Sequence, residues 1–307
     1  MIVLRGHPFE WEVPGSTAVT VGVFDGVHIG HRRVLADLVK AARERGLLPA
    51  VVTFDPHPLH FLAPDRAPLM LTSVEQRIEQ FRQLGIEVSG ILHFPDIRDL
   101  TAEEFATQVL APALQAQWVV VGADFRFGRD RGGDAGLLQR MGEEEGFEVS
   151  IVDMYGREEE VVSSTRIRAL LSEGNVEEAA SLLDRPYELT GVVQPGDGRG
   201  RTIGFPTANL AVAPEHLLPA NGVYACRIRG DLGLREAVVN IGTRPTFGGQ
   251  DRRVEAFLFD FDGDLYGREL AVRFVARIRG ERTFAGVEDL RRQIEADAAA
   301  ARVLLGG

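Results

Sequence analysis

The sequence of 307 residues contains a single cysteine, Cys226. An internal disulfide and a cysteine-rich zinc site are therefore excluded, and we expect this residue to be a buried structural thiol. Lysine is equally scarce, because Lys40 is the only one. A mechanism that needs a catalytic lysine elsewhere, as in a Walker loop or the KMSKS loop of a synthetase, is excluded. Phosphate must then be bound by arginine, histidine and backbone N–H groups.

Long hydrophobic runs are also absent. The N-terminus, MIVLRGHPFEWEVPG, has no long apolar run behind a basic start, and no later segment approaches a membrane span. We therefore expect a cytoplasmic protein with no membrane partner. Positive charge is in deficit, with a net charge of −11 and a pI near 5.2. This balance argues against a broad nucleic-acid surface, which needs clustered lysine and arginine.

The composition, with 45% hydrophobic and 26% charged residues, is that of an ordinary globular protein long enough for two domains. Up to about residue 184, predicted strands alternate with predicted helices, which indicates an α/β domain with a doubly wound parallel sheet. The expected strands are a run that ends at residues 24–26 and the runs at 47–54, 85–94, 117–122, 147–154 and 158–163. We expect helices capped by Thr72 with Glu75 and by Thr101 with Glu104, and another at 135–145.

From Tyr187 the sequence changes to closely spaced β runs separated by glycine turns. The runs lie at 187–194, 206–212, 222–230, 235–242, 253–261 and 268–280. About six short strands suit a small closed β-barrel, and an amphipathic helix at 286–305 is expected to pack against it. We therefore predict two domains, residues 1–184 and residues 185–307.

Two histidines follow the first strand of the α/β domain, in GVFDGVHIGH at residues 22–31. His28 and His31 are three apart, so both imidazoles project from the first turn of a helix, where free N–H groups attract anions. Gly26 and Gly30 would let a nucleotide approach the backbone closely. Two such histidines are more often a cap and a surface residue, but the Gly, Asp and His spacing after a strand favours a phosphate site. Neither a GxGxxG fingerprint nor a P-loop is present.

The tetrapeptide HIGH resembles the HxGH turn that holds the α-phosphate of ATP in two families. These are the small-molecule nucleotidylyltransferases and the class I aminoacyl-tRNA synthetases. The acidic charge and the absence of a lysine loop favour the nucleotidylyltransferases.

Two later segments of the α/β domain carry further candidates. The strand that ends in GADFRFG places Asp124 and Phe125 where they could grip a heteroaromatic base, although the phenylalanine is as readily a core residue. In SSTRIR, residues 163–168, three hydroxyl side chains precede a helix that bears Arg166 and Arg168. This is either an ordinary cap with a solvated arginine face or a second anion site, and the HxGH turn in the same domain favours the anion site.

The barrel has its own candidate site in GDGRGRTIGFPTANL, residues 196–210. Glycine-rich loops alone are weak signals, because most are hairpin turns, but backbone N–H groups in this one could wrap phosphates. Thr207 and Asn209 are two apart, so in a strand they point to the same face and could offer oxygen ligands to Mg²⁺. Glu255 lies in an otherwise apolar strand, where it is either a general base or a strand-edge carboxylate paired with an arginine such as Arg244.

GVFDGVHIGH, FDPHP, VVGADFRFG and SSTRIR, followed by GDGRG, GFPTANL, RPTFGG and VEAFLFDFDGDLYG, closely resemble the bacterial bifunctional riboflavin kinase and FAD synthetase family. The resemblance spans nearly the whole chain. One departure is Asp184, at a position where the family pattern leads us to expect glycine. The resemblance implies an N-terminal FMN adenylyltransferase domain and a C-terminal riboflavin kinase barrel.

The motifs and the resemblance together predict the site residues. The predicted catalytic residues are Glu255, His28, His31 and Arg168. The predicted ATP or phosphate contacts are Gly22, Phe24, Gly26, Gly30, Ser163, Ser164, Thr165, Arg166, Gly196, Gly198, Arg199 and Gly200. Asp124, Phe125 and Phe54 are expected at the flavin or base, and Thr207 and Asn209 at Mg²⁺.

The expected partners are the small molecules riboflavin, FMN and ATP, for a monomer or weak homo-oligomer. Three rival interpretations stay open at this point. The protein could adenylylate another small molecule and use the barrel as a regulator that binds a flavin or other ligand. It could also be a non-enzymatic flavin sensor or, least favoured, a class I synthetase.

Overall fold

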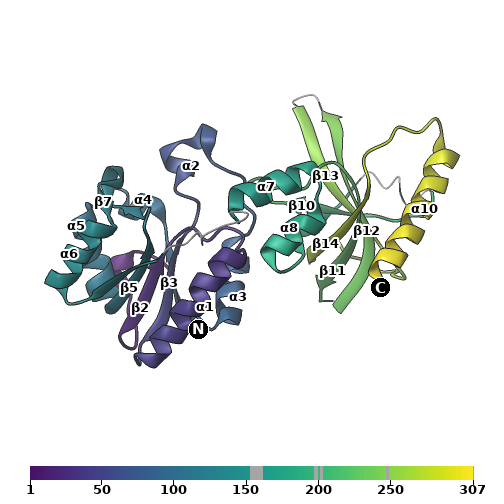
Figure 1. Cartoon of the computed structure of the whole chain (residues 1–307). Coiled ribbons are helices and arrows are strands. Elements are labelled where there is room, and N and C mark those ends of the chain that lie inside the picture. The colour runs from purple at the N-terminus through teal and green to yellow at the C-terminus, as the bar shows by residue number, and fades with distance from the viewer. Residues whose placement is uncertain (153–161, 197–199, 201–202, 232, 247–248, 307) are drawn as a thin grey trace. The chain divides into compact units, whose positions relative to one another are not determined.

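The computed structural model describes residues 1–152, 162–196, 200, 203–231, 233–246 and 249–306, with the backbone alone for 244–246 and 249–251 (Figure 1). Contacts divide the chain into two compact units, Met1–Pro68 with Thr72–Ser163, and Leu69–Leu71 with Ser164–Gly307. The second unit therefore begins upstream of residue 184. The boundary at 184 was predicted for the functional domains, and it stays a prediction. The predicted strand at 158–163 lies largely outside the described residues.

The first unit is built on a six-stranded parallel sheet with the order β1-β4-β3-β2-β5-β8. Its strands are β1 (Ile2–Leu4), β2 (Thr17–Val21), β3 (Leu48–Phe54), β4 (Val88–Leu92), β5 (Ala116–Gly122) and β8 (Glu148–Val152). A small hairpin of β6 (Arg126–Phe127) and β7 (Gly133–Asp134) follows β5. The sequence prediction of a doubly wound parallel sheet is confirmed.

Helices cover both faces of this sheet. They are η1 (Pro8–Glu10), α1 (Ile29–Glu44), α2 (Leu59–Leu62), η2 (Pro64–Arg66), α3 (Val74–Leu84), α4 (Phe94–Ile97), α5 (Ala102–Phe105), the π-helical η3 (Ala106–Ala113), η4 (Arg129–Arg131) and α6 (Ala135–Glu145). Thr101 caps α5 with Glu104, as predicted. The predicted cap of α3 is wrong by one residue, because Ser73 forms the capping box with Gln76.

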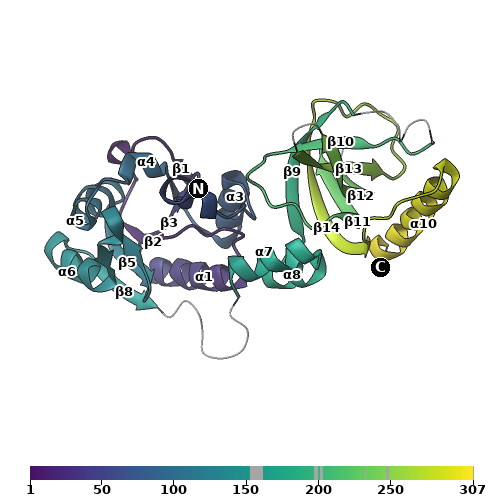
Figure 2. The same cartoon turned by 90° about the horizontal axis from the view of Figure 1, so that it is seen from above.

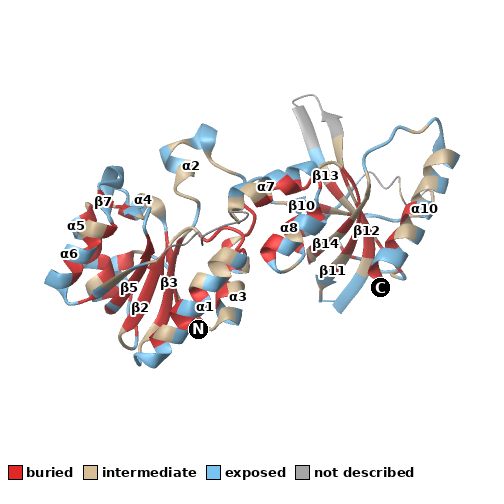
Figure 3. Ribbon diagram, viewed as in Figure 1, coloured by how far each residue is buried: buried red, intermediate tan, exposed pale blue. Residues whose placement is uncertain are grey.

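Strict alternation along the strands produces two apolar layers. Val19 of β2 and Val119 of β5 face a layer completed by α5, η3 and α6, whereas Ala18 and Val120 face one completed by α1 and α3. Successive side chains of a strand point to opposite faces, so a sheet buried on both sides needs apolar residues at every position. Figure 3 shows the strands of this sheet as buried along most of their length.

The second unit contains a closed six-stranded antiparallel barrel with the order β10-β13-β12-β11-β14-β9. Its strands are β9 (Tyr187–Gln194), β10 (Ala208–Val212), β11 (Gly222–Gly230), β12 (Gly233–Thr246), β13 (Gly249–Leu258) and β14 (Glu269–Arg279). Its helices are α7 (Ser164–Glu173), α8 (Val176–Leu183) and α10 (Val287–Leu305). The barrel and the terminal helix are confirmed, and every predicted β run corresponds to a strand.

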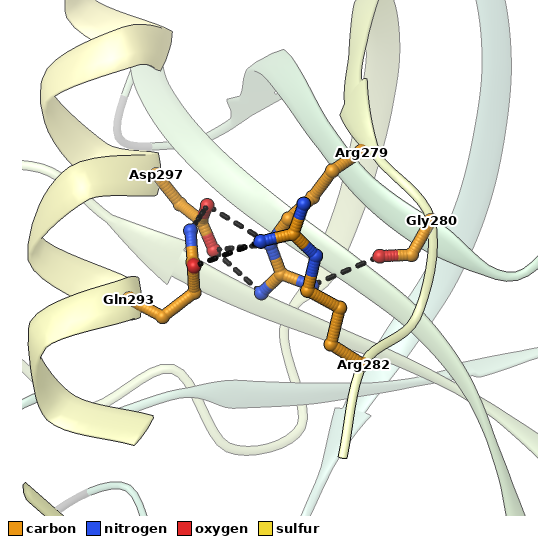
Figure 4. A network of polar contacts seen from close by, with 5 residues as sticks. All are labelled: Arg279, Gly280, Arg282, Gln293 and Asp297. Atoms are coloured by element: carbon orange, nitrogen blue, oxygen red, sulfur yellow. Dashed lines mark hydrogen bonds and ion pairs between the residues drawn. The ribbon is translucent and has the colours of Figure 1, made fainter. Parts of the chain in front are cut away.

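The terminal helix α10 lies along the outside of the barrel, beside β11, β12 and β14 (Figure 2). Ala301 and Leu305 of the helix pack against Val223 and Val238. A buried ion pair joins the helix to the end of β14, with Arg279 Nη2 2.7 Å from Asp297 Oδ2 (Figure 4). A buried, bidentate pair of this kind fixes the position of the helix along the strand.

The departure at Asp184 has a conformational explanation. Asp184 is the C-cap of α8 and adopts a left-handed conformation with φ of 59°. Glycine enters that region without steric cost, and aspartate is among the residues that tolerate it.

In the part of the chain that the structure describes, no helix is both long and apolar enough to cross a membrane.

Candidate functional site

The HxGH turn lies at the carboxyl end of β2, where the order of the sheet reverses. From β2 the chain passes to β3 and β4 on one side, and later to β5 and β8 on the other. Thr20 of β2 is in register with Val120 of β5, so the segments that follow these strands leave the same edge of the sheet side by side. Open α/β sheets bind ligands at this switch point. The topology therefore places the histidines where a nucleotide is expected.

His28 is the N-cap of α1. Its Nδ1 accepts a hydrogen bond from the backbone N–H of His31 at 3.3 Å, and the side chain is buried. A ring nitrogen that accepts carries no proton in neutral imidazole, so the proton of neutral His28 lies on Nε2. The side chain is thus a helix cap, as the alternative to a phosphate site expects. Its Nε2–H is also a donor beside the N–H groups of the first helical turn.

The imidazole of His31 stacks on that of His28, with 3.6 Å between ring centroids. Phe24 packs edge-on against His31, with 5.2 Å between ring centroids. Because Phe24 is itself buried, it supports the His31 ring from the core. The Nδ1 atom of His31 is buried and has no hydrogen-bond partner among the described residues. A buried polar atom without a partner is rare in folded proteins and marks this turn as a site for a polar ligand.

Burial lowers the pKa of His31 well below 6.5, and the nearby His28 lowers it further. Its imidazole is therefore neutral at about pH 7 in the free protein. Because the folded chain binds fewer protons here than the unfolded chain, the stability that this residue contributes is present above about pH 6.5 and is lost as the pH falls below that value. We expect an NMR titration of the His31 ring, assigned with a His31→Asn variant, to have its midpoint below 6.5. A midpoint at or above 6.5 would contradict the buried placement.

Thr72 holds the turn through hydrogen bonds to Asp25 and Gly26. Asp25 is buried, and its Oδ1 accepts hydrogen bonds from the backbone N–H and the hydroxyl of Thr72, both at 3.1 Å. The Thr72 hydroxyl oxygen in turn accepts from the N–H of Gly26, at 3.0 Å. Gly26 has φ of 80°, a conformation that suits glycine. Sequence reasoning treated Thr72 as a helix cap and missed this role.

Arg77 is a second residue that sequence reasoning missed. Its buried guanidinium donates to the carbonyl of Val23 at 2.8 Å, the hydroxyl of Thr53 at 2.7 Å and the carbonyl of Phe54 at 2.9 Å. Burial lowers its pKa, which the carboxylate of Asp25 partly offsets. Arg77 therefore ties together the carboxyl ends of β2 and β3 beneath the HxGH turn. The sequence does carry an indication of this role, because position 77 falls on the apolar face of α3, where an arginine is unexpected.

The three residues predicted at the flavin or base lie at the same edge of the sheet. Phe54 ends β3 and is half-buried, and Phe125 follows β5 and stacks on Phe127 with 5.3 Å between centroids. Asp124 is exposed in the turn after β5. Both phenylalanines also pack against the core, as the core interpretation expects, and their contact with a flavin or base stays a prediction. Gly22 directly follows β2, and an added Cβ there would lie 3.0 Å from the ring of Phe24.

The SSTRIR segment begins α7. Ser163 belongs to the first unit, whereas Ser164, Thr165, Arg166 and Arg168 belong to the second. Arg166 is paired with Glu178 at 3.0 Å, and Arg168 Nε donates to the carbonyl of Leu69 at 2.8 Å. The role of these residues at the ATP phosphates stays a prediction.

In the barrel, Gly196 and Gly200 lie against the PTAN segment. A Cβ at Gly196 would collide with the side-chain amide of Asn209, and one at Gly200 would lie 3.3 Å from the hydroxyl oxygen of Thr207. Asn209 Oδ1 is buried and has no hydrogen-bond partner among the described residues. Gly198 and Arg199 lie outside the described residues.

Glu255 lies in the middle of four polar residues in register on adjacent strands. Asn209 of β10 pairs with Glu255 of β13, Glu255 pairs with Asn240 of β12, and Gln194 of β9 pairs with Asn209. We call Gln194, Asn209, Glu255 and Asn240 the polar row. Their strand neighbours, such as Val254 and Ala256, are buried, so the polar row lies on the outer face of the barrel. The side chain of Arg244, the alternative partner of Glu255, lies outside the described residues.

The close approach of Gly196 to Asn209 leads to a prediction. In Gly196→Ala, the new methyl group must displace the Asn209 amide, and a displacement of about 1 Å at a reacting centre costs about 10²-fold in rate. We expect kcat/KM for ATP in phosphoryl transfer at the barrel to fall by about this factor, while a reaction at the HxGH turn of the same chain is unchanged. Gly286→Ala is the matched control, because a Cβ there meets no atom within 4 Å. Equal activities of the two variants would contradict the contact.

Comparison with known families matches both parts of the chain. The model of the FAD synthetase family matches residues 11–166, and the model of the riboflavin kinase family matches residues 183–305. Helices α7 and α8 lie for the most part between the two matched segments. The HxGH turn falls in the first match, and the PTAN segment and Glu255 fall in the second.

Relatives are similar over their whole length. The bifunctional riboflavin kinase/FMN adenylyltransferase of Escherichia coli K12 is 38% identical, with 100% of this chain and 98% of the relative covered. The protein of the same name from Bacillus subtilis 168 is 36% identical, with 96% and 94% covered. The crystal structure of a protein named macrolide-efflux protein, from Streptococcus pneumoniae, is 35% identical with a TM-score of 0.87 and covers 98% of this chain and 99% of that one.

Proposed function

Because the chain belongs to the family of bifunctional riboflavin kinase/FMN adenylyltransferases, we propose that its two activities reside at the two places described above. Riboflavin is phosphorylated by ATP at the polar row of the barrel, which gives FMN and ADP. FMN is then adenylylated by a second ATP at the HxGH turn, which gives FAD and pyrophosphate. The observation that carries this assignment is the register that sets Glu255 directly beside Asn209.

In the kinase half, Glu255 acts as the general base. Its carboxylate takes the proton of the 5′-hydroxyl of riboflavin while that oxygen bonds to the γ-phosphorus of ATP and the bond to ADP breaks. Neighbouring strands lie about 4.8 Å apart, so the carboxylate and the Asn209 amide can reach the acceptor oxygen and the phosphate at the same time. Because Gly196 and Gly200 have no Cβ, their backbones can approach the side chains of Asn209 and Thr207 closely.

The residues present fit Mg²⁺, which such phosphoryl transfer uses to neutralise charge on the phosphate oxygens. The unpartnered buried oxygen of Asn209 is the kind of acceptor that a hard cation takes, and we propose that Asn209 and Thr207 would hold the ion together with the ATP phosphates. Among the described residues, no group of three or more His, Cys, Asp and Glu side chains could hold a metal without a substrate.

In the adenylyltransferase half, the nucleophile is the phosphate of FMN, which is already an anion, so no strong base is needed. Its oxygen bonds to the α-phosphorus of ATP, and pyrophosphate leaves. We propose that the Nε2–H of His28, the ring of His31 and the first N–H groups of α1 donate to the α-phosphate oxygens as negative charge develops. Arg168 and the hydroxyl groups of SSTRIR are proposed for the phosphates that leave.

The cytoplasmic location, the absence of nucleic-acid partners and a monomeric or weakly associated state stay predictions from the sequence.

The proposed function is tested by incubating the purified protein with riboflavin, ATP and Mg²⁺ and separating the flavins by chromatography over time. We expect FMN first and FAD later. FMN without FAD would overturn the assignment of the HxGH turn, and no conversion by a folded protein would overturn both assignments.

A further inference from the structure

The side chain of Asn240 is a part of the polar row that the mechanism above does not use. It lies on the outer face of β12, beside Glu255 and on the side opposite Asn209. Within the described residues its amide forms no hydrogen bond, and it is half-buried. Asparagine is disfavoured inside strands, and its neighbours in the sequence, Val239 and Ile241, are apolar and buried. The amide of Asn240 is therefore available to a polar group outside the barrel.

The two sides of Glu255 differ in what surrounds them. On the Asn209 side lie two glycines, Gly196 against the amide and Gly200 near Thr207. On the Asn240 side, the next residue in register is Val223, which packs under α10 in an apolar cluster with Val238 and Phe257. The first side suits the phosphates of ATP, and the second suits a molecule with a polar chain and an apolar ring system.

The direction of phosphoryl transfer follows from this asymmetry. The attacking and leaving oxygens must lie roughly in line on opposite sides of the γ-phosphorus. If the phosphates enter from the Asn209 side and Glu255 takes the proton, the acceptor hydroxyl must approach from the Asn240 side. The chain that carries this hydroxyl then passes over the Asn240 amide, which can both donate and accept.

Gly242 and Glu281 lie beside Asn240. A Cβ at Gly242 would lie 3.2 Å from Asn240 Nδ2 and 2.8 Å from Glu281 Oε1. Glu281 is held there by Asn221 Nδ2 at 3.0 Å and by the N–H of Thr243 at 3.3 Å.

The loop that carries Glu281 contacts α10 near its start. It leaves β14 at Arg279, which is paired with Asp297 of α10, and Arg282 Nη1 donates to Gln293 of the same helix at 3.4 Å (Figure 4). Gln293 Nε2 in turn donates to Asp297 Oδ1 at 2.8 Å. This network connects the loop that carries Glu281 to α10.

We propose that Asn240 is the residue that binds the ribityl chain of riboflavin and directs its terminal hydroxyl to Glu255. This inference rests on the proposed kinase activity and goes beyond it, because it assigns the acceptor side of the polar row. Asn240 would contact the polyol chain of riboflavin and not the isoalloxazine ring or ATP.

Steady-state kinetics of Asn240→Ala test the inference. Loss of one or two hydrogen bonds to the chain is expected to raise KM for riboflavin by about 10- to 100-fold and to leave KM for ATP within about twofold. Glu269→Ala, at an exposed position at the start of β14 and outside the polar row, is the control and should leave KM for riboflavin unchanged. FMN adenylylation by each variant reports on the integrity of the rest of the chain.

Lumiflavin, which has the same ring system but no ribityl chain, separates the chain from the ring. Its inhibition constant against riboflavin should be the same for the natural protein and Asn240→Ala. An equal increase for both flavins, an increase in KM for ATP alone, or an unchanged KM for riboflavin would each overturn the inference.

If Asn240→Ala does not fold, the isosteric Asn240→Asp replaces it, with the same expected rise in KM for riboflavin and the same overturning outcomes. The natural protein is assayed first. Absence of riboflavin phosphorylation there refutes the proposed function, whereas normal kinetics in the Asn240 variants refute this inference alone.

Discussion

Glu255→Gln is expected to lower kcat for riboflavin phosphorylation by about 10³-fold, because a positioned general base contributes about 10²- to 10⁴-fold. Glutamine keeps the size and the hydrogen-bonding shape of the side chain between Asn209 and Asn240 but cannot take the proton. The measurement is the initial rate of FMN formation from riboflavin and ATP. The same preparation should still convert added FMN to FAD at the natural rate.

The control for this substitution is Glu269→Gln, an exposed glutamate at the start of β14 and outside the polar row. It should phosphorylate riboflavin normally. Kinase activity of Glu255→Gln within about tenfold of the natural protein would show that Glu255 is not the base. The alternative, in which Glu255 is a strand-edge carboxylate paired with an arginine, predicts that Glu255→Gln changes the free energy of unfolding and has little effect on the rate of FMN formation.

His28→Asn is expected to lower the rate of FAD formation from FMN by about 10²- to 10³-fold, the effect of removing a donor to developing charge. The choice of asparagine follows from the structure. His28 caps α1 through Nδ1, and asparagine is a strong N-cap whose side-chain oxygen can accept from the same N–H of His31. The substitution thus removes the imidazole and the stacking on His31 while it keeps the cap.

A companion variant, His28→Ala, removes the cap as well and should cost about 1 kcal/mol of stability. We expect both variants to lose adenylylation to the same extent, while only His28→Ala lowers the free energy of unfolding. Riboflavin phosphorylation should be normal in both. Normal FAD formation in His28→Asn would mean that His28 serves the helix and not the nucleotide.

Most of the fold could be predicted, because it is encoded in local periodicity. Runs such as VVVG of β5 and AVV of β3 are apolar at consecutive positions, which is the pattern of strands buried on both faces. The barrel strands were recognised because turn residues separate them at short intervals. The start of α3 was misplaced by one residue, since Thr72 and Ser73 are both good caps and only the contact with Asp25 decides between them.

The site was predicted where a motif is local and missed where distant segments meet. His28 and His31 form one helical turn, so their proximity follows from spacing alone. Arg77 reaches the ends of β2 and β3 from a helix far along the chain, and no local pattern gives its three acceptors. Asn240 beside Glu255 depends on the register of β12 against β13, which turn lengths in the sequence do not determine.

The central claim is that the two activities belong to two separate sites in one chain. Mixing Glu255→Gln with His28→Asn tests it most directly, with riboflavin, ATP and Mg²⁺ supplied and the flavins followed over time. Neither variant alone should make FAD from riboflavin, and the mixture should make it after a lag, as FMN released by one variant is adenylylated by the other. If either folded variant lacks both half-reactions, so that the mixture yields no FAD, the account of two separate sites is wrong.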